Sequence, residues 1–320
     1  MDGESRRFIA ETPHSGRTIL DALRKFLPGS SWSDLRKLLA ARRVLVNGAL
    51  CLDEARRLST GEVIEISART QARPPVAADV RVVWLDADVV VVDKPAGMIT
   101  LRHRTERDWS IQKKSLQPAL DDVLPELIAA RERLDRKVAP RIFSVHRIDR
   151  ETSGLLVFAR SVAARDSLIR QFESHSVDRT YLAVVQGDLA HQTFDSHLVE
   201  DRGDGRRGST SQPGTGKRAV THVRPVERLK GWTLLECRLE TGRTHQIRIH
   251  LSEAGHPVYG DSKYGPPTTS QEAMTVRKMA LHATTLGFDH PRDGRRLKFE
   301  SPPPRDFEQI VAALRQVDEE

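Results

Sequence analysis

The hydrophobic pattern of the chain changes from helical spacing near the N-terminus to strand-like runs further on. After Thr18, apolar residues recur at every third or fourth position and end at a Pro-Gly pair, which predicts a helix. A second helix is expected to begin after Ser30 or Ser31, because serine is a preferred N-cap residue. Short strands are predicted at residues 44–48, which enter an Asn-Gly turn, and at 62–66.

Beyond this region, an aperiodic stretch with two adjacent prolines reads as a linker, and runs rich in β-branched residues follow it. The strands predicted there span residues 80–84, 89–92, 155–159, 180–185, 219–225 and 232–239. Helices are expected after Ser161, near residues 247–251 and after Pro304, whereas residues 102–118 are charged and aperiodic and predict a mobile surface loop. The pattern predicts an α+β protein with a disordered tail at 1–13, a small module at 14–68, a linker at 69–79 and a larger domain at 80–320.

The charge balance favours a polyanionic partner such as nucleic acid. Lysine and arginine total 51 against 44 acidic residues, which gives a formal charge of +7. Aromatic residues make up only 5%, which argues against a broad base-stacking surface. Two cysteines are too few for a disulfide framework, and no apolar run approaches the ~20 residues of a membrane span. We therefore expect a cytoplasmic, monomeric protein without a membrane segment.

One carboxylate has an unusual setting. Asp149 lies between Arg147 and Arg150, just before Gly154 and a five-residue apolar run. Such an aspartate is ordinarily part of a solvated ion pair. Here, however, Thr152 and the following residues suit a tight, internally hydrogen-bonded loop at the edge of a buried strand. A carboxylate held in this way could act as a nucleophile.

Other patterns give weaker indications. Residues 203–208 match the dinucleotide fingerprint by spacing alone and lack its strand and helix context, and residues 214–218 miss a phosphate-binding loop. His245 and His250 lack the glutamate of a zinc protease helix, so no metal site is expected. We interpret the stretch 200–218 as a flexible basic hairpin that contacts RNA phosphates. The residues expected to contact RNA are Arg36, Lys37, Arg42 and Arg43 near the second helix, and Arg206, Arg207, Lys217 and Arg218 in the hairpin.

Four segments in order resemble one family. HRIDRETSGLLVFAR at residues 146–160 resembles the motif of the RluA-type RNA pseudouridine synthases, as do KPAG at 94–97, TGRTHQIR with its continuation at 241–265, and residues 281–291. The sequence departs from the family in residues 99–104, and Ile148 stands where leucine is more frequent. The resemblance implies a mixed, largely antiparallel sheet with a central cleft. The N-terminal helices, VLVNG and the strand after them resemble an S4-like RNA-binding domain.

The resemblance also implies roles for particular residues and requires no cofactor or metal. Those roles are Asp149 as nucleophile, Tyr181 as the residue that stacks on the target base, Arg243 as the partner of the carboxylate, Arg147 as the side chain that fills the gap left by the flipped uridine, Leu281 as a wall of the base pocket, and Lys94 and Thr152 as further substrate-binding residues.

The function expected from the sequence is therefore isomerisation of specific uridines in structured RNA, by base flipping and a nucleophilic aspartate. The S4-like module favours large-subunit ribosomal RNA over transfer RNA. Two alternatives remain at this point: a synthase that acts on transfer RNA, and a catalytically silent RNA-binding or ribosome-assembly factor of the same fold. A hydrolase that uses Asp149 with His146 is disfavoured, because no second acid lies at a recognisable spacing.

Overall fold

The computed structural model describes residues 5–47, 49–68, 70, 73–110, 114, 117–135, 140–203, 206–265 and 278–315. The chain divides into two compact units, the smaller made chiefly of residues before Pro75 and the larger chiefly of residues from Pro75 onwards. No helix among the described residues is both long enough and apolar enough to cross a membrane. Each unit has its own hydrophobic core.

The smaller unit packs two helices on a four-stranded antiparallel sheet of order β1-β4-β2-β3. Its elements are β1 (Arg6–Ile9), η1 (Thr12–His14), α1 (Ile19–Phe26), α2 (Trp32–Ala40), β2 (Val44–Val46), β3 (Ala49–Leu50) and β4 (Val63–Ile66). Thr18 and Ser31 cap the two helices through their side chains, so both predicted helix starts are confirmed. The expected disordered tail was wrong from Arg6 onwards, because β1 pairs with β4 and Phe8 stacks on Phe26.

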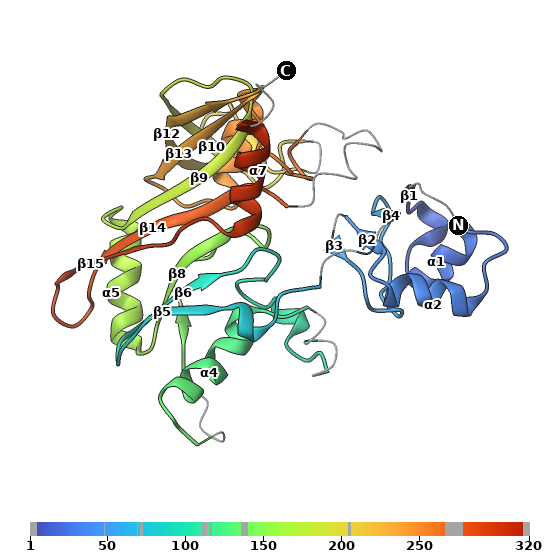
Figure 1. Ribbon diagram of the computed structural model, residues 1–320, viewed down its shortest axis with the longest axis horizontal. Coiled ribbons are helices and arrows are strands. Elements are labelled where there is room, and N and C mark those ends of the chain that lie inside the picture. The colour runs from blue at the N-terminus through green and yellow to red at the C-terminus, as the bar shows by residue number, and fades with distance from the viewer. Residues whose placement is uncertain are drawn as a thin grey trace. The chain divides into compact units, whose positions relative to one another are not determined.

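The larger unit is built on one mixed sheet whose main path runs β11-β10-β12-β13-β9-β14-β8-β6-β5, with β15 paired to β14 and β7 to β8 (Figure 1). The strands are β5 (Arg81–Leu85), β6 (Val89–Lys94), β7 (Phe143–Ser144), β8 (Ser153–Ala159), β9 (Asp178–Gln186), β10 (Gln192–Val199), β11 (Gly208–Thr210), β12 (Lys217–Leu229), β13 (Trp232–Leu239), β14 (Leu281–Asp289) and β15 (Arg296–Glu300). The pairing between β8 and β14 is parallel, and the other pairings are antiparallel. The predicted α+β class is confirmed.

Helices cover both faces of the sheet near β6 and β8. The helical elements are η2 (Ala77–Asp79), η3 (Arg104–Glu106), α4 (Leu120–Arg131), α5 (Val162–Glu173), α6 (Gln246–Glu253) and α7 (Arg305–Arg315). Along β6, Val90 and Val92 share a core with α4, whereas Val89 and Val91 share a second core with α5. Because successive strand residues face opposite sides, this run of valines is buried on both faces, as predicted.

Gly154 lets the parallel neighbours β8 and β14 approach each other. Its φ is +112°, and a Cβ at this position would lie 2.3 Å from the carbonyl oxygen of Ala283 on β14. Only glycine tolerates both the backbone conformation and the contact. The close approach brings the loop that ends in β8, which contains Asp149, next to Leu281 at the start of β14.

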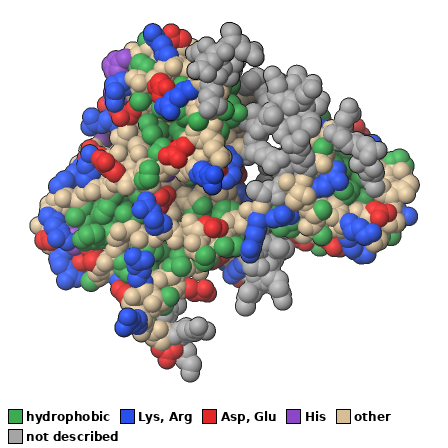
Figure 2. Space-filling view, viewed as in Figure 1, with side chains coloured by type: hydrophobic (Ala, Val, Ile, Leu, Met, Phe, Trp, Pro, Cys, Tyr) green, Lys and Arg blue, Asp and Glu red, His purple; other side chains and the backbone are tan. Residues whose placement is uncertain are grey.

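Charged side chains of both signs are mixed over the surface. Figure 2 shows lysine and arginine interspersed with aspartate and glutamate among the described residues of the visible face.

Candidate active site

A cavity of about 670 Å³ lies in the larger unit at the residues singled out by the sequence motifs. Its walls come from the loop before β8, from β9, from the segment that leads into α6, and from the start of β14. The predicted residues that line it are Arg147, Asp149, Thr152, Tyr181, Arg243 and Leu281.

The loop that carries Asp149 is fixed by hydrogen bonds. The amide of Thr152 donates to the Asp149 carbonyl at 3.2 Å, and the Thr100 hydroxyl donates to the Ile148 carbonyl at 2.7 Å. The Asp149 side chain remains 17% exposed toward the cavity. The sequence expectation of a tight, internally bonded loop is confirmed, and it gives the carboxylate one defined position.

Arg248 forms the ion pair with Asp149. Its Nη1 donates to Asp149 Oδ2 at 3.0 Å, while its Nε and Nη2 donate to the two carboxylate oxygens of Asp261 at 2.7 and 2.8 Å. Arg243, which was expected to pair with Asp149, instead donates from Nε to the Arg218 carbonyl at 3.0 Å. That expectation was wrong: Arg248 lies in the first turn of α6, whereas Arg243 precedes the helix and is exposed.

Asp261 orients Arg248 from the side opposite to Asp149. Burial alone would raise the pKa of Asp261, but hydrogen bonds and charge from Arg248 and the backbone amides of Tyr264 and Lys263 leave it below its usual value. The Asp261 side chain is fully buried and the Arg248 side chain is 8% exposed. The fork between two carboxylates leaves the Arg248 guanidinium little freedom to rotate.

Lys94 does not reach the cavity, so its predicted role in substrate binding was wrong. Its side chain is fully buried, and its Nζ donates to the carbonyls of Pro95, Met98 and Arg150 at 3.0, 2.8 and 3.2 Å. Burial lowers the pKa of Lys94 to about 7. These bonds join the Lys-Pro-Ala-Gly turn to the loop of Asp149, where the Gly97 amide also donates to the Arg150 carbonyl.

Tyr181 and Leu281 form apolar walls of the cavity. They are 8% and 3% exposed, and β9 and β14 hold them on neighbouring strands, with Tyr181 paired to Ala283. Burial raises the pKa of Tyr181 to about 12, so its phenol stays protonated at neutral pH. Arg147 is exposed at the cavity, and Thr152 is buried beside it.

His245 is a further cavity residue to which sequence reasoning gave no function. It adopts a left-handed backbone conformation (φ 60°), its Nδ1 lies 2.8 Å from the Tyr264 hydroxyl, and its Nε2 lies 3.9 Å from Asp149 Oδ1. Burial lowers the pKa of His245 to about 4, so the ring is neutral at pH 7. A left-handed histidine between two motif residues is a signal that only a structure reveals.

The basic residues expected to contact RNA are largely paired within the protein. Their partners are Glu54 for Arg36, Asp34 for Lys37, the Ser67 carbonyl for Arg43, Glu200 for Arg207 and Asp195 for Arg218. The expected flexible hairpin contains β11, which pairs with β10, and Lys217 begins β12, while residues 204–205 lie outside the described part. Exposed pairs of this kind contribute little to stability and can exchange partners.

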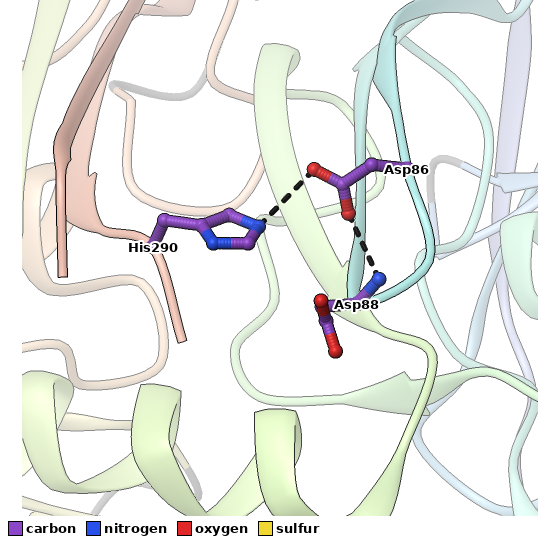
Figure 3. A group of neighbouring side chains, drawn as sticks. All are labelled: Asp86, Asp88 and His290. Carbon is purple, nitrogen blue, oxygen red and sulfur yellow. Dashed lines mark hydrogen bonds and ion pairs between the residues drawn. The ribbon is translucent and has the colours of Figure 1, made fainter. Parts of the chain in front are cut away.

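A second cluster combines two carboxylates and a histidine. In Figure 3 the His290 ring points toward Asp86, beside Asp88. Asp86 accepts hydrogen bonds from the Trp84 indole, the His290 ring and the amides of Asp88 and Val89, and Asp88 accepts one from Arg292. Because these donors already use the carboxylate oxygens, the cluster fits a structural role that fastens the β5–β6 turn rather than a metal site.

Comparison with known proteins identifies the class of this site. The sequence profile of the RNA pseudouridylate synthase family matches residues 88–253. The chain is 35% identical to the uncharacterized RNA pseudouridine synthase YlyB of Bacillus subtilis strain 168 over 300 residues, which cover 91% of this chain and 93% of that protein. It is 36% identical to ribosomal large subunit pseudouridine synthase D of Neisseria meningitidis serogroup B, over 92% of this chain and 78% of the relative.

Solved structures share the fold. The human RNA pseudouridylate synthase domain containing 4 aligns with a TM-score of 0.58 at 23% identity, over 73% of this chain and 92% of that one. The human RNA pseudouridylate synthase domain containing 1 aligns with a TM-score of 0.56 at 25% identity, over 77% and 98%. The chain belongs to the RNA pseudouridylate synthase family, and the predicted RluA-type resemblance is confirmed. It is an RNA pseudouridine synthase, an isomerase.

Proposed function

We propose that this enzyme isomerises uridines of large-subunit ribosomal RNA, with Asp149 as the nucleophile. The main support is the position of Asp149. Its carboxylate lines the cavity, its loop is fixed by hydrogen bonds, and the Arg248 guanidinium donates to it at 3.0 Å. The ribosomal substrate is supported by relatives that are named ribosomal large subunit pseudouridine synthase D, such as that of Neisseria meningitidis.

The reaction is an intramolecular exchange of bonds. The bond between ribose C1′ and uracil N1 breaks, the uracil turns, and a bond between C1′ and C5 forms. C5 loses a proton and N1 gains one, so no electrons are transferred. Asp149 would act by covalent catalysis or by forming a glycal, and Arg248 would keep it ionised and correctly oriented for either route.

Access to both reacting atoms requires that the uridine leave its stack. Flipping costs about a few kcal/mol, and stacking on an aromatic side chain can offset it. Tyr181 and Leu281 offer apolar surface for the flipped base, and the exposed Arg147 is placed to enter the vacated space.

The smaller unit would serve as the RNA-binding module. Its two capped helices and small sheet fit an S4-like domain, and α2 carries Arg36 and Lys37 on its exposed side. The surface pairs of these two residues can exchange their carboxylates for phosphates at small cost. We assign the chain from β1 (Arg6–Ile9) to residue 68 to this module, one strand more than the sequence expectation of 14–68, and residues 80–320 to the catalytic domain.

The test is turnover on RNA labelled with 5-tritiated uridine, in which loss of the C5 proton releases tritium. Wild-type protein should release tritium from large-subunit ribosomal RNA, and Asp149→Asn should release none while it still binds the RNA. Glu151→Gln is a matched control, because Glu151 is a neighbouring exposed carboxylate outside the cavity lining.

Appreciable turnover by Asp149→Asn would refute the assignment of Asp149 as the nucleophile. Turnover confined to transfer RNA would show that transfer RNA, and not ribosomal RNA, is the substrate. Binding without tritium release from any RNA by wild-type protein would favour a silent RNA-binding or ribosome-assembly factor.

A further inference from the structure

Arg179 on β9 is a buried cation in the wall of the active-site cavity. It is 6% exposed, and its Nη2 donates to the Glu240 carbonyl at 2.7 Å. Its Nε is buried and has no hydrogen-bond partner among the described residues, and its guanidinium lies 5.3 Å from the Phe172 ring centre. A buried donor without a partner is uncommon in native structures and calls for an explanation, of which a bound anion is one.

No carboxylate within the described residues forms an ion pair with Arg179. Burial lowers the pKa of Arg179, Tyr181 offsets part of this shift, and the charge of Arg243 lowers the pKa further. Arg243 lines the same cavity and donates to the Arg218 carbonyl through Nε, again without a carboxylate partner in the described part of the chain. Two guanidinium groups of like charge line one cavity, and neither has a carboxylate ion-pair partner among the described residues, so this part of the cavity is suited to an anion.

Gly242 keeps this region open. Its φ lies outside the left-handed range, so the backbone does not require glycine there. A Cβ at this position, however, would lie 2.6 Å from Nη1 of Arg179. Glycine often marks a site where another group must approach the backbone closely. Gly242 is exposed, and it therefore leaves clearance over Nη1 at the cavity side.

We propose that Arg179 and Arg243 together bind one phosphodiester of the RNA, next to the uridine that enters the cavity. The inference rests on the proposed action on RNA and adds an anchor for its backbone. Arg179 supplies a fixed buried charge, and Arg243 supplies an exposed one at the rim. The base itself has other walls, Tyr181 and Leu281, and the carboxylate Asp149 already has Arg248.

Salt dependence of RNA binding tests the proposal. Binding is measured in the Asp149→Asn background, where no turnover occurs, with large-subunit ribosomal RNA over a series of KCl concentrations. Each phosphate contact contributes roughly 0.7 to 0.9 to the slope of log K against log salt. Arg179→Met and Arg243→Met should each lower the slope by about this amount, and the double variant should lose no more than one single variant. Arg228→Met, an exposed arginine outside the cavity paired with Asp188, should leave the slope unchanged.

Gly242→Ala tests the geometry with both charges kept. The added methyl group displaces the guanidinium of Arg179, and RNA binding should weaken by on the order of tenfold. This variant also carries the test if Arg179→Met fails to fold, which circular dichroism would show.

Other outcomes overturn the proposal. Arg179→Met could leave the salt slope unchanged and yet reduce turnover in the enzyme that keeps Asp149. That result would show that Arg179 acts on the base, for example on a departing uracil anion. A slope loss for only one of the two arginines, or additive losses in the double variant, would exclude a shared phosphate. The proposed reaction and the proposed phosphate contact can fail separately, because binding is measured without turnover. If wild-type protein releases no tritium, the proposed reaction is refuted, but the salt slope still tests whether Arg179 and Arg243 bind a phosphodiester.

Discussion

Replacing Arg248 with methionine should both destabilise the protein and abolish turnover. The guanidinium makes two hydrogen bonds to Asp261, at 2.7 and 2.8 Å, and one to Asp149, at 3.0 Å. The Asp261 side chain is fully buried, so its charge cannot be compensated by water. Breaking a buried pair by removal of one partner costs about 3–5 kcal/mol, and we expect a loss of unfolding free energy in that range at pH 7.

The pH dependence of this loss follows from the pKa of Asp261. With Arg248 present the pKa lies below its usual value, so the pair stabilises the folded state above the pKa of an unfolded aspartate and loses that contribution as the pH falls through the folded value. Without Arg248, burial raises the pKa. Asp261 then takes up a proton on acidification, and the destabilisation of Arg248→Met should shrink at low pH.

A second substitution separates stability from catalysis. Asp261→Asn in the Arg248→Met background removes the buried charge. The asparagine Oδ1 can still accept from the amides of Lys263 and Tyr264, which lie 2.9 and 3.0 Å from Oδ1 of Asp261 in the present structure. Denaturant unfolding should show most of the stability regained, while tritium release stays absent because Asp149 still lacks its cation. The reasoning is refuted if the single variant unfolds within about 1 kcal/mol of wild type, or if the double variant regains turnover.

Three further changes test other parts of the site. Gly154→Ala should cost about 3 kcal/mol or more of unfolding free energy in denaturant titration, because its Cβ would meet the Ala283 carbonyl at 2.3 Å; a stable variant would contradict the close approach. Lys94→Met leaves three carbonyls without their ammonium donor and should cost about 2–3 kcal/mol with reduced tritium release, whereas unchanged stability would show that the bonds are dispensable. The pKa of His245 is lowered from 6.5 to about 4, so between these values the unfolded chain binds more protons and the folded state loses stability as the pH drops. His245→Asn should remove about 2–3 kcal/mol of this loss, measured as the difference in unfolding free energy between pH 6.5 and pH 4. An unchanged pH dependence would contradict the pKa shift.

Local pattern predicted most of the elements that carry the site. The start of the first helix after Thr18, a serine cap at Ser30 or Ser31 for the second, the run of valines in β6 and the strand after Gly154 all followed from residue type and period. Helix α4 was missed although its apolar residues recur four apart, because Pro125 lies inside it and proline usually ends a helical prediction.

The partner of Asp149 could not be chosen from the sequence. The motif Thr-Gly-Arg-Thr-His-Gln-Ile-Arg offers two arginines five residues apart, and either could face the carboxylate. The choice depends on where the helix begins. His245, in a left-handed conformation, turns the chain so that α6 starts at Gln246 and Arg248 lies in its first turn. Residues other than glycine adopt this conformation in only a few per cent of cases, so nothing in the sequence indicates it at this position.

Lys94 illustrates the same limit for burial. A lysine at the end of a strand is ordinarily exposed, because its charge is expensive to bury. Here the turn after Lys94 folds back, and the carbonyls of Pro95, Met98 and Arg150 surround its ammonium. The contact with Arg150 spans 56 positions along the chain. It depends on tertiary structure that a residue pattern does not contain.

The arginines around the cavity differ in what they are bound to, and the difference indicates their roles. Arg248 is held by two carboxylates, so its charge is committed to the protein and to the orientation of Asp149. Arg147 is exposed, and Arg179 and Arg243 have no carboxylate partner among the described residues, so their charges remain available to RNA. In the proposed mechanism, orientation of Asp149 and binding of the RNA backbone fall to separate guanidinium groups. Screening by salt acts on the exposed charges far more than on a buried pair, so RNA affinity can vary with ionic strength while the Asp149 carboxylate keeps its orientation.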